Sequence, residues 1–232
     1  MPRKKPSTIS LPVVGNTATD LHRPWKDGGG LVHVDAVYHV PDVHPTSDGP
    51  WATEADKIAW TDPVSGYGCI IRRHPAGGYL CGYVSVPPGH PLFGRESGTL
   101  TGIMIGVHGG LDYSAACEDW EDEDRSVCHP NGVPPGFQQG IHRNEAADDD
   151  AWWFGFSCNQ RTDLLPEDAR RPREARTPAF GIDDSTYRTE AFVYAECIRL
   201  AAQLKAIEQD RDPRSADPGP SVIAPSDAEY RR

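Results

Sequence analysis

The sequence predicts an α+β fold: a single domain made mainly of antiparallel sheet, with long loops and a C-terminal helix packed on one face. Segments with strand patterns precede one long helical segment instead of alternating with helices, which argues against a βαβ chain. The chain contains 23 Gly and 22 Pro, which keep regular elements short and separate them by turns. Its 6 Trp, 8 Tyr and 6 Phe indicate a buried core although the hydrophobic share is only 38%.

The chain divides into three parts. Residues 1–25 are polar and basic and are expected to form a flexible N-terminal arm. Residues 26–209 are expected to form the single domain, because 232 residues suffice for one well-buried core. Residues 210–232 are rich in Asp, Pro, Ser and Arg, a composition that predicts a disordered tail.

The first half of the chain is expected to hold one short helix among several strands. Residues 31–40 alternate between apolar and polar side chains, which predicts a strand that ends at Pro41. Residues 51–60 are expected to form the short helix, with Thr53 and Asp56 as a variant of the capping box. Two segments rich in aromatic and β-branched residues, separated by Pro-Ala-Gly-Gly, predict a hairpin over 67–74 and 79–86.

The second half is expected to contribute two more strands and the main helix. Residues 99–107 predict a strand, and residues 152–158 concentrate Trp and Phe in a way that predicts a buried one. Residues 186–209 predict the helix, because apolar residues recur along one face in alternating steps of four and three. These residues are Val193, Cys197, Leu200, Leu204 and Ile207.

The distribution of charged residues argues against two kinds of binding partner, nucleic acid bound nonspecifically and a specifically bound calcium ion. The net charge of −11 argues against nonspecific binding of nucleic acid, which needs a basic surface. Acidic residues concentrate in 118–124 and 148–150, where they would form solvated loops, a cation site or a surface that imitates a nucleic-acid backbone. Neither run has the alternating ligand spacing of a calcium-binding loop, so specific calcium binding is not expected.

The remaining bulk features concern localisation and cysteine chemistry. No apolar segment is long enough to cross a bilayer, and no hydrophobic stretch follows the basic N-terminal residues. We therefore expect a protein of the cytoplasm, of a bacterial cell or a host, with its 6 Cys as reduced thiols. The Cys residues stand singly instead of in Cys-x-x-Cys pairs, which does not favour a structural zinc site.

A candidate site begins directly after the strand predicted over 99–107. There His108 is followed by Gly109 and Gly110. Glycines after a strand let a ligand approach the backbone, and an adjacent His can serve as a base or a metal ligand. Tyr113 and Ser114 would add hydrogen-bonding groups to the same cavity. The alternative is a tight turn that exposes a His with no role.

Three further residues are candidates for this site. His90 lies in a Pro-Gly-His-Pro sequence whose backbone is restricted on both sides. Asp163 follows the aromatic strand, and Glu196 lies about 60° from the centre of the apolar stripe of the predicted helix. A set of His and carboxylate groups can hold a divalent metal ion that activates water. The structural alternatives are a rigid turn, a loop cap and an ion pair, respectively.

Several short motifs together resemble one protein family. They are Trp51-Ala-Thr-Glu54, Cys81-Gly-Tyr-Val84, Gly89-His90-Pro91, His108-Gly-Gly-Leu111, Trp152-Trp-Phe-Gly-Phe156 and Tyr194-Ala-Glu196. In this order they resemble a largely uncharacterised family encoded by phages, prophages and bacterial chromosomes, over roughly residues 50–205. The resemblance implies no particular activity.

The chain departs from that family's pattern after the aromatic strand. The family pattern continues with Asp, then Cys, then a His two residues later, before a Gly-Asp pair. Here Ser157, Cys158, Gln160 and Thr162-Asp163 occupy those places. If the family's Asp and His form a metal or acid–base site, the resemblance implies that this chain has lost two of its groups.

We therefore predict a phage-type accessory protein that binds a host protein or a small signalling ligand, with no catalysis assumed. The alternative is a metal-assisted hydrolase of a small polar or nucleotide-like substrate, and a structural virion component is a third hypothesis. No nucleophile elbow, Walker A, dinucleotide or His-Glu-x-x-His sequence occurs. The catalytic candidates are His108, His90, Asp163 and Glu196, and the ligand-binding candidates are Gly109, Gly110, Tyr113, Ser114 and Ser157.

Overall fold

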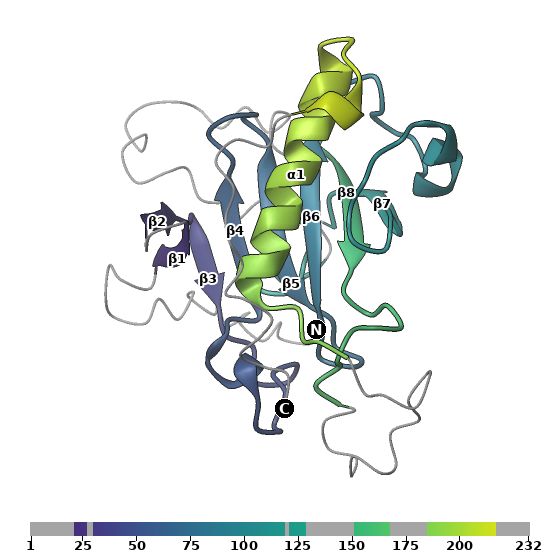
Figure 1. The fold of residues 1–232 in the computed structure, drawn as a ribbon. Helices are drawn as coiled ribbons and strands as arrows, with labels where there is room; N and C mark the ends of the chain where they lie inside the picture. Colours follow the sequence, from purple (N-terminus) through teal and green to yellow (C-terminus); the bar gives the residue numbers. More distant parts are fainter. Residues whose placement is uncertain (1–20, 27–29, 119–120, 129–150, 168–184, 217–232) are drawn as a thin grey trace, which may run out of the picture.

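The described residues form a six-stranded antiparallel sheet, a separate two-stranded sheet and one long helix (Figure 1). The computed structural model describes residues 21–26, 30–118, 121–128, 151–167 and 185–216. The strands are β1 (His22–Lys26), β2 (Gly30–His33), β3 (Ala36–Tyr38), β4 (Lys57–Thr61), β5 (Gly68–Arg73), β6 (Leu80–Val86), β7 (Tyr113–Ala116) and β8 (Trp152–Ser157). The large sheet has the order β3-β4-β5-β6-β8-β7, and β1 pairs with β2.

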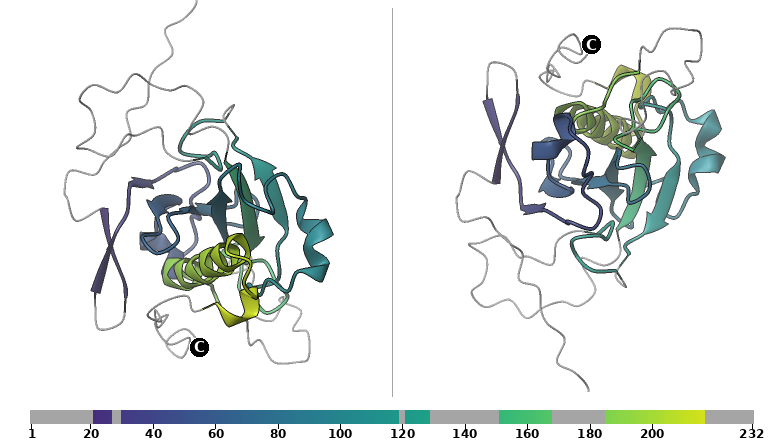
Figure 2. Two further views of the ribbon diagram at one scale, coloured as in Figure 1. Left: turned by 90° about the horizontal axis from the view of Figure 1, so that it is seen from above. Right: turned by 90° about the horizontal axis from the view of Figure 1, so that it is seen from below.

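Helix α1 (Glu190–Glu208) packs on one face of the large sheet, against β5 and β6. Figure 2 shows from above and from below that α1 lies along one side of the sheet. The predicted α+β architecture, with a mainly antiparallel sheet and a C-terminal helix on one face, is therefore confirmed. We call the side of the sheet that α1 covers the helix face and the opposite side the loop face.

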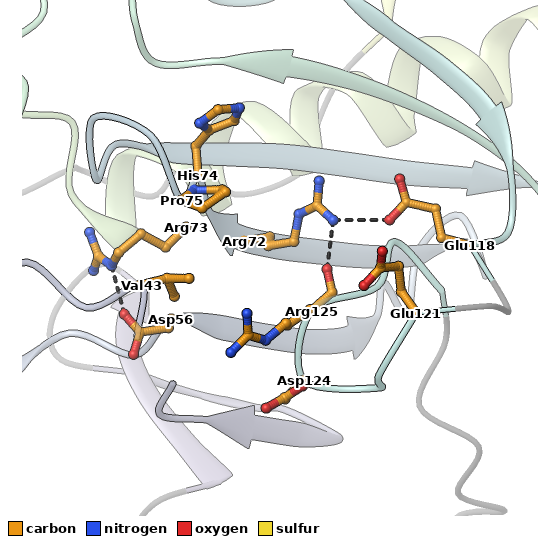
Figure 3. A pocket seen from close by; sticks show the side chains of 10 residues that line it. All are labelled: Val43, Asp56, Arg72, Arg73, His74, Pro75, Glu118, Glu121, Asp124 and Arg125. Atoms are coloured by element: carbon orange, nitrogen blue, oxygen red, sulfur yellow. Dashed lines mark hydrogen bonds and ion pairs between the residues drawn. The ribbon is translucent and has the colours of Figure 1, made fainter. Parts of the chain in front are cut away.

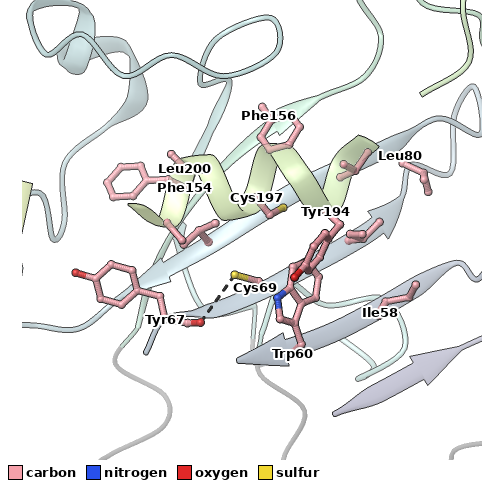
Figure 4. Close-up of a cluster of buried hydrophobic side chains, with 14 of the residues drawn as sticks. Ile58, Trp60, Tyr67, Cys69, Leu80, Phe154, Phe156, Tyr194, Cys197 and Leu200 are labelled. Atoms are coloured by element: carbon pink, nitrogen blue, oxygen red, sulfur yellow. Dashed lines mark hydrogen bonds between the residues drawn. The ribbon is translucent and has the colours of Figure 1, made fainter. Parts of the chain in front are cut away.

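The main core lies between α1 and the helix face (Figure 4). Trp60, Cys69, Leu80, Phe154 and Phe156 point toward the helix, because alternate residues of a strand share one face. From α1, the predicted stripe residues Val193, Cys197, Leu200 and Leu204 are buried against them, and Ile207 is half-buried. The helical repeat in the sequence thus marks the buried side of α1.

Gly82 in β6 lets these layers approach closely. A Cβ atom at this position would lie 2.5 Å from Cζ of Phe156 and 2.7 Å from Sγ of Cys197. Both distances are far below van der Waals contact, so a larger residue would push α1 or β8 outward. The absence of a side chain at Gly82 therefore sets the spacing between the helix and the sheet.

A second, smaller core lies on the loop face. Ala59, Ile70, Cys81, Tyr83 and Trp153 pack there with Val127, which belongs to residues 117–128. The ends of this segment are joined by a disulfide between Cys117 and Cys128, and we call it the disulfide loop. The expectation of six reduced thiols is wrong for this pair, whereas the remaining four cysteines are free and buried: Cys69, Cys81, Cys158 and Cys197.

The predicted hairpin and the predicted aromatic strand are confirmed. Strands β5 and β6 pair in register through Ile71 and Gly82, and Gly77 and Gly78 between them adopt φ values of 93° and 72°. Only glycine takes such left-handed conformations without strain, which is why the turn needs both. Strand β8 lies between β6 and β7, and its side chains are buried on both faces: Phe154 and Phe156 in the core under α1, and Trp153 in the core of the loop face.

The helix predicted over 51–60 is wrong. Only Pro50–Thr53 forms a helical turn, of the 3₁₀ type, and Trp60 lies in β4. Strand β4 is paired on both sides, with β3 and β5, and these hydrogen bonds outweigh the local helical signals. Asp56 does not cap a helix; it accepts hydrogen bonds from the backbone N of Val40 and from Nε of Arg73.

The strand predicted over 99–107 is also wrong. A 3₁₀ turn covers Ser97–Gly102, and residues 103–107 are irregular. The side-chain amide of Gln203 on α1 takes the place of a strand partner. Its Oε1 accepts from the N of Gly106 at 2.7 Å, and its Nε2 donates to the O of Gly106 at 2.9 Å. The segment is therefore held by the helix instead of the sheet.

Other element boundaries shift by a few residues. The segment 31–40 divides into β2 and β3 at a bend, and α1 begins at Glu190 after the cap residue Thr189 instead of at 186. Residues 22–25, which the sequence assigns to the arm, belong to β1, and Trp25 packs on Tyr194 of α1 at 4.7 Å. A short 3₁₀ turn, Pro213–Ser215, follows α1.

Some predicted features lie outside the described residues. These are residues 1–20 of the arm, residues 217–232 of the tail and the acidic run 148–150. In the part of the chain that is described, no helix combines the length and apolar character needed to cross a membrane.

Candidate functional site

The turn that carries His108 is held by the helix and by the segment after β8. The backbone N of His108 donates a hydrogen bond to Oε2 of Glu196 at 2.8 Å. Gly109 and Gly110 follow with φ values of 70° and 86°, so the predicted glycine turn forms. A Cβ on Gly109 would lie 2.3 Å from Nε2 of Gln160, but this flexible side chain can shift, so the positive φ is the reason for glycine here.

His108 and Asp163 form a hydrogen-bonded pair. Nε2 of His108 lies 2.7 Å from Oδ2 of Asp163, whose side chain is fully buried. The same oxygen accepts from the backbone N of Gln160 at 2.8 Å, and Oδ1 accepts from Nε of Arg188 at 2.8 Å. Burial raises the pKa of Asp163, but the hydrogen bonds from His108, Arg188 and Gln160 outweigh it and hold the pKa below its usual value.

The imidazole of His108 is fixed through one nitrogen and open at the other. The carboxylate accepts, so Nε2 carries the proton in the neutral ring. The ring also stands edge-on to Phe192, with centroids 5.2 Å apart at 90°, and its side chain is 14% exposed. No hydrogen-bond partner for Nδ1 is found among the described residues. A base oriented by a buried carboxylate has this arrangement.

Glu196 positions this pair but does not face the imidazole. Its two oxygens are used by the backbone of His108 and by Arg199, whose Nη1 lies 2.7 Å from Oε1. The carboxylate is buried between these partners. Glu196 therefore contacts the site only through the backbone of the His108 turn, which it holds against α1.

His90 does not join the other three candidates. Its Nε2 donates to the carbonyl of Leu204 at 2.9 Å, and its Nδ1 accepts from the N of Leu92 at 3.1 Å. Leu204 lies roughly two turns, or about 12 Å, beyond Glu196 along α1. Burial lowers the pKa of His90 and favours the neutral ring that these two bonds require. His90 thus holds the Pro-rich loop against the helix.

The predicted ligand-binding residues are dispersed. Tyr113 lies on the loop face, where its hydroxyl donates to Oε1 of Glu118 at 3.0 Å. Oγ of Ser114 accepts from the N of Ser97 at 2.7 Å. Oγ of Ser157 lies 3.5 Å from Sγ of Cys81. Gly109 and Gly110 remain beside His108, but the sheet separates Tyr113 from it.

A cavity of about 330 Å³ opens on the loop face (Figure 3). Its walls come from β5, the hairpin turn, the disulfide loop and the segments around residues 43 and 56. The lining residues are mostly charged: Asp56, Arg72, Arg73, His74, Glu118, Glu121, Asp124 and Arg125, together with Val43 and Pro75. None of them is among the catalytic or ligand-binding candidates, although Glu118, Glu121 and Asp124 belong to the acidic run for which a cation site was one alternative.

Part of this charge is already neutralised inside the protein. Nη1 of Arg72 donates to Oε2 of Glu118 at 3.0 Å and to the carbonyl of Arg125 at 2.6 Å. Behind the cavity wall, Nε of Arg73 pairs with Oδ1 of Asp56 at 2.8 Å. These pairs form the rigid frame of the cavity.

The remaining charges are available to a ligand. Arg125 makes one ion pair, to the exposed Asp42 at 3.0 Å, and its side chain is 42% exposed. Figure 3 shows its guanidinium group directed into the cavity, away from Glu121. The carboxylates of Glu121 and Asp124 have no hydrogen-bond or ion-pair partner within the described ranges. The cavity therefore presents two carboxylates without a partner in the described residues and one guanidinium group of which Asp42 occupies only a part.

The chain matches no family model, no curated protein and no solved structure. The resemblance to phage and prophage proteins therefore stays a prediction. As for the predicted divalent ion, no group of three or more His, Cys, Asp or Glu side chains in the described part of the chain is arranged to hold a metal.

One sequence signal did point toward the cavity. Arg72 and Arg73 end a strand that is otherwise apolar, and adjacent strand residues face opposite sides of a sheet. One of the two must therefore lie on the loop face, where it needs an acidic partner. The partner is Glu118, from the acidic run for which the sequence left a solvated loop, a cation site or a surface that imitates a nucleic-acid backbone open.

Proposed function

We propose that this protein binds a small charged ligand in the cavity on the loop face. The observation that carries the proposal is the cavity itself, whose volume of about 330 Å³ lies at the lower end of the range of small-molecule sites, about 300–1,000 Å³. Most of its lining side chains carry charged groups, so a charged ligand that pairs with them fits better than an apolar one. This function corresponds to the predicted accessory protein that binds a small signalling ligand. The Cys117–Cys128 disulfide does not favour the predicted cytoplasm, where thiols are usually reduced.

The cavity is built before any ligand arrives. The disulfide fixes both ends of its loop wall, and Arg72 holds that wall through Glu118 and the carbonyl of Arg125. A wall that is already ordered loses little conformational entropy on binding, which favours affinity. This rigidity supports a binding site over an incidental surface hollow.

Arg125 offers the most direct test, because its side chain is partly exposed and its replacement should not unfold the protein. We expect at least one compound from a panel of amino acids, carboxylates, sugar phosphates, nucleotides and polyamines to raise the melting temperature. Isothermal titration should show that Arg125→Ala weakens its binding by about 10-fold or more, the loss of one charge-assisted hydrogen bond.

Arg95→Ala is the matched control, because Arg95 is an exposed arginine outside the cavity lining. This variant should bind as the parent does. The proposal is contradicted if no compound in the panel binds, or if Arg125→Ala binds as tightly as the parent protein.

The pair of His108 and Asp163 favours a second candidate function, a hydrolase. An imidazole with a buried carboxylate on Nε2 and an open Nδ1 can take a proton from water or from a substrate hydroxyl. The metal-assisted form predicted from the sequence would need further ligands beside Nδ1 of His108, and no group of three His, Cys, Asp or Glu side chains in the described part of the chain supplies them.

Hydrolysis of p-nitrophenyl acetate and p-nitrophenyl phosphate, with and without added Mn²⁺, tests this second candidate. We expect His108→Gln to lower the rate by about 100-fold or more and His39→Gln, at an exposed position, to leave it unchanged. If the parent protein is inactive on both compounds, or if His108→Gln is as active as the parent, the hydrolase is rejected and the binding function stands alone.

A further inference from the structure

We propose that the ligand of the loop-face cavity is a zwitterion, a small molecule that carries both an ammonium group and a carboxylate, as free amino acids and dipeptides do. This assignment rests on the proposed binding function and specifies its ligand. The cavity contains two sets of charged groups: those that already bind other groups of the protein, and those that a ligand can still bind.

The groups open to a ligand carboxylate are on Arg72 and Arg125. Arg72 uses both N–H groups of Nη1 and one of Nη2, which donates to the hydroxyl of Tyr83 at 3.3 Å. Its Nε–H and the second N–H of Nη2 have no acceptor within the described part of the chain. Arg125 gives one N–H to Asp42 and directs its guanidinium group into the cavity (Figure 3). Arginine presents such donors in the planar geometry that a carboxylate requires.

The groups open to a ligand ammonium are Glu121 and Asp124. The other two carboxylates of the lining are already used. Glu118 accepts from Arg72, from the hydroxyl of Tyr113 and from the N of Val127, whereas Asp56 accepts from Val40, His44 and Arg73. Glu121 and Asp124 keep all their acceptor positions, as far as the described residues show.

A ligand with a single charge satisfies only one of these sets. An anion would pair with Arg125 but would bring its charge toward Glu121 and Asp124, and a cation would do the reverse. A molecule with one charge of each sign pairs with both sets at once. Figure 3 shows the carboxylate of Glu121 and the guanidinium of Arg125 on different sides of the cavity, as two separate ligand groups require.

The test measures binding of the 20 free amino acids and a set of glycyl dipeptides to the full-length protein by isothermal titration. Each compound that binds is then compared with its N-acetyl derivative, which keeps only the carboxylate, and with its C-terminal amide, which keeps only the ammonium group. We expect each derivative to bind at least about 10-fold more weakly than the parent compound. Comparison with the dipeptides shows whether the protein prefers to bind a free amino acid or a peptide.

Two variants assign the two ends. Glu121→Gln should weaken binding of the zwitterion and of its amide, but not of the N-acetyl derivative. Arg125→Gln should weaken binding of the zwitterion and of the N-acetyl derivative, but not of the amide. Asp122→Asn is the control, because Asp122 is exposed in the same loop and does not line the cavity, and it should change none of these affinities.

The outcomes separate this inference from the function on which it rests. If a singly charged derivative binds as tightly as its parent compound, or if only a singly charged compound from the wider panel binds, the zwitterion is rejected and ligand binding at the cavity stands. If the two variants weaken every compound equally, the assignment of the two ends is rejected. If no charged compound of any kind binds, both the inference and the function fail.

Discussion

Buried charged side chains in this protein act in closely bonded groups. Arg73 is fully buried in β5, and its guanidinium donates to Asp56, Glu54, Tyr187 and two backbone carbonyls. The group ties the hairpin to the segments before β4 and before α1, which are far apart in the sequence. Removing one partner would leave a buried charge uncompensated, which is why such groups are sensitive to substitution.

Glu190, at the start of α1, provides a test at the residue scale. Burial, together with repulsion from Glu54, raises the pKa of Glu190 to about 7. The folded protein therefore binds this proton more tightly than the unfolded chain. The resulting stabilisation is complete below about pH 4.5 and is lost as the pH rises through about 7.

We expect Glu190→Gln to raise the free energy of unfolding at pH 8 by about 1–2 kcal/mol and to change it little at pH 5. The amide oxygen can still accept the hydrogen bond from the N of Ala55, which the carboxylate receives at 2.6 Å. Urea unfolding at both pH values measures the effect. An equal effect at the two pH values would contradict the pKa assignment, and the exposed Glu96→Gln serves as control.

At the scale of elements, the described part of the disulfide loop is attached to the sheet by side-chain hydrogen bonds and not by strand pairing. Tyr38 donates to Oε1 of Glu123 at 2.9 Å, and Nζ of Lys57 donates to the carbonyl of Glu123 and to Oγ of Ser126. Val127 is fully buried in the core of the loop face. Burial lowers the pKa of Lys57 to about 8, a value at which it is still mostly protonated at pH 7.

Opening this loop should affect both stability and binding. In the double variant Cys117→Ser/Cys128→Ser, we expect the free energy of unfolding to fall by about 2–3 kcal/mol, because the unfolded chain gains freedom. Binding at the cavity should weaken as its wall loosens. Urea unfolding and titration with the ligand measure the two effects.

A reducing agent should have the same effects on the parent protein and none on the double variant. If reduction leaves the stability of the parent unchanged, the disulfide does not contribute to the folded state. If stability falls but affinity does not, the loop wall is held by Tyr38, Lys57 and Arg72 alone.

At the scale of the whole molecule, the sheet has two covered faces, and they differ in chemistry. The helix face is covered by α1 and an apolar core, whereas the loop face carries a small core and a charged cavity. The helical period along α1 and the aromatic run of β8 predicted the helix face, because a buried face leaves a repeat in the sequence. A cavity lined by single residues from several segments leaves no such repeat.

The errors in the fold have the same physical origin. Residues 51–60 and 99–107 carry patterns that fit more than one element, and contacts distant in sequence decided between them. For the first, the deciding contacts are strand pairing of β4 with β3 and β5. For the second, the side chain of Gln203 satisfies the backbone of Gly106.

The candidate site was predictable in part. Residue types and the glycine turn singled out His108 and Asp163, and the structure joins them at 2.7 Å. His90 also stands beside a glycine in a restricted turn, yet its Nε2 binds the carbonyl of Leu204 on α1, and its Nδ1 binds the backbone N of Leu92 in its own loop. The sequence alone could not separate these two histidines, because the difference lies in which partner each ring meets.

The order of hairpin, aromatic strand and C-terminal helix was thus already contained in the amino-acid pattern, since turn residues and the repeat of apolar side chains mark each of these elements locally. Which charges remain free was decided only by folding. Arg72 pairs with Glu118, and Arg73 pairs with Asp56. Arg125 pairs with Asp42 through one nitrogen only, so the rest of its guanidinium group and the carboxylates of Glu121 and Asp124 remain around an open cavity. A charged side chain can bind a ligand only through those of its groups that no other part of the folded chain already binds. Tertiary contacts between segments distant in sequence determine which groups these are.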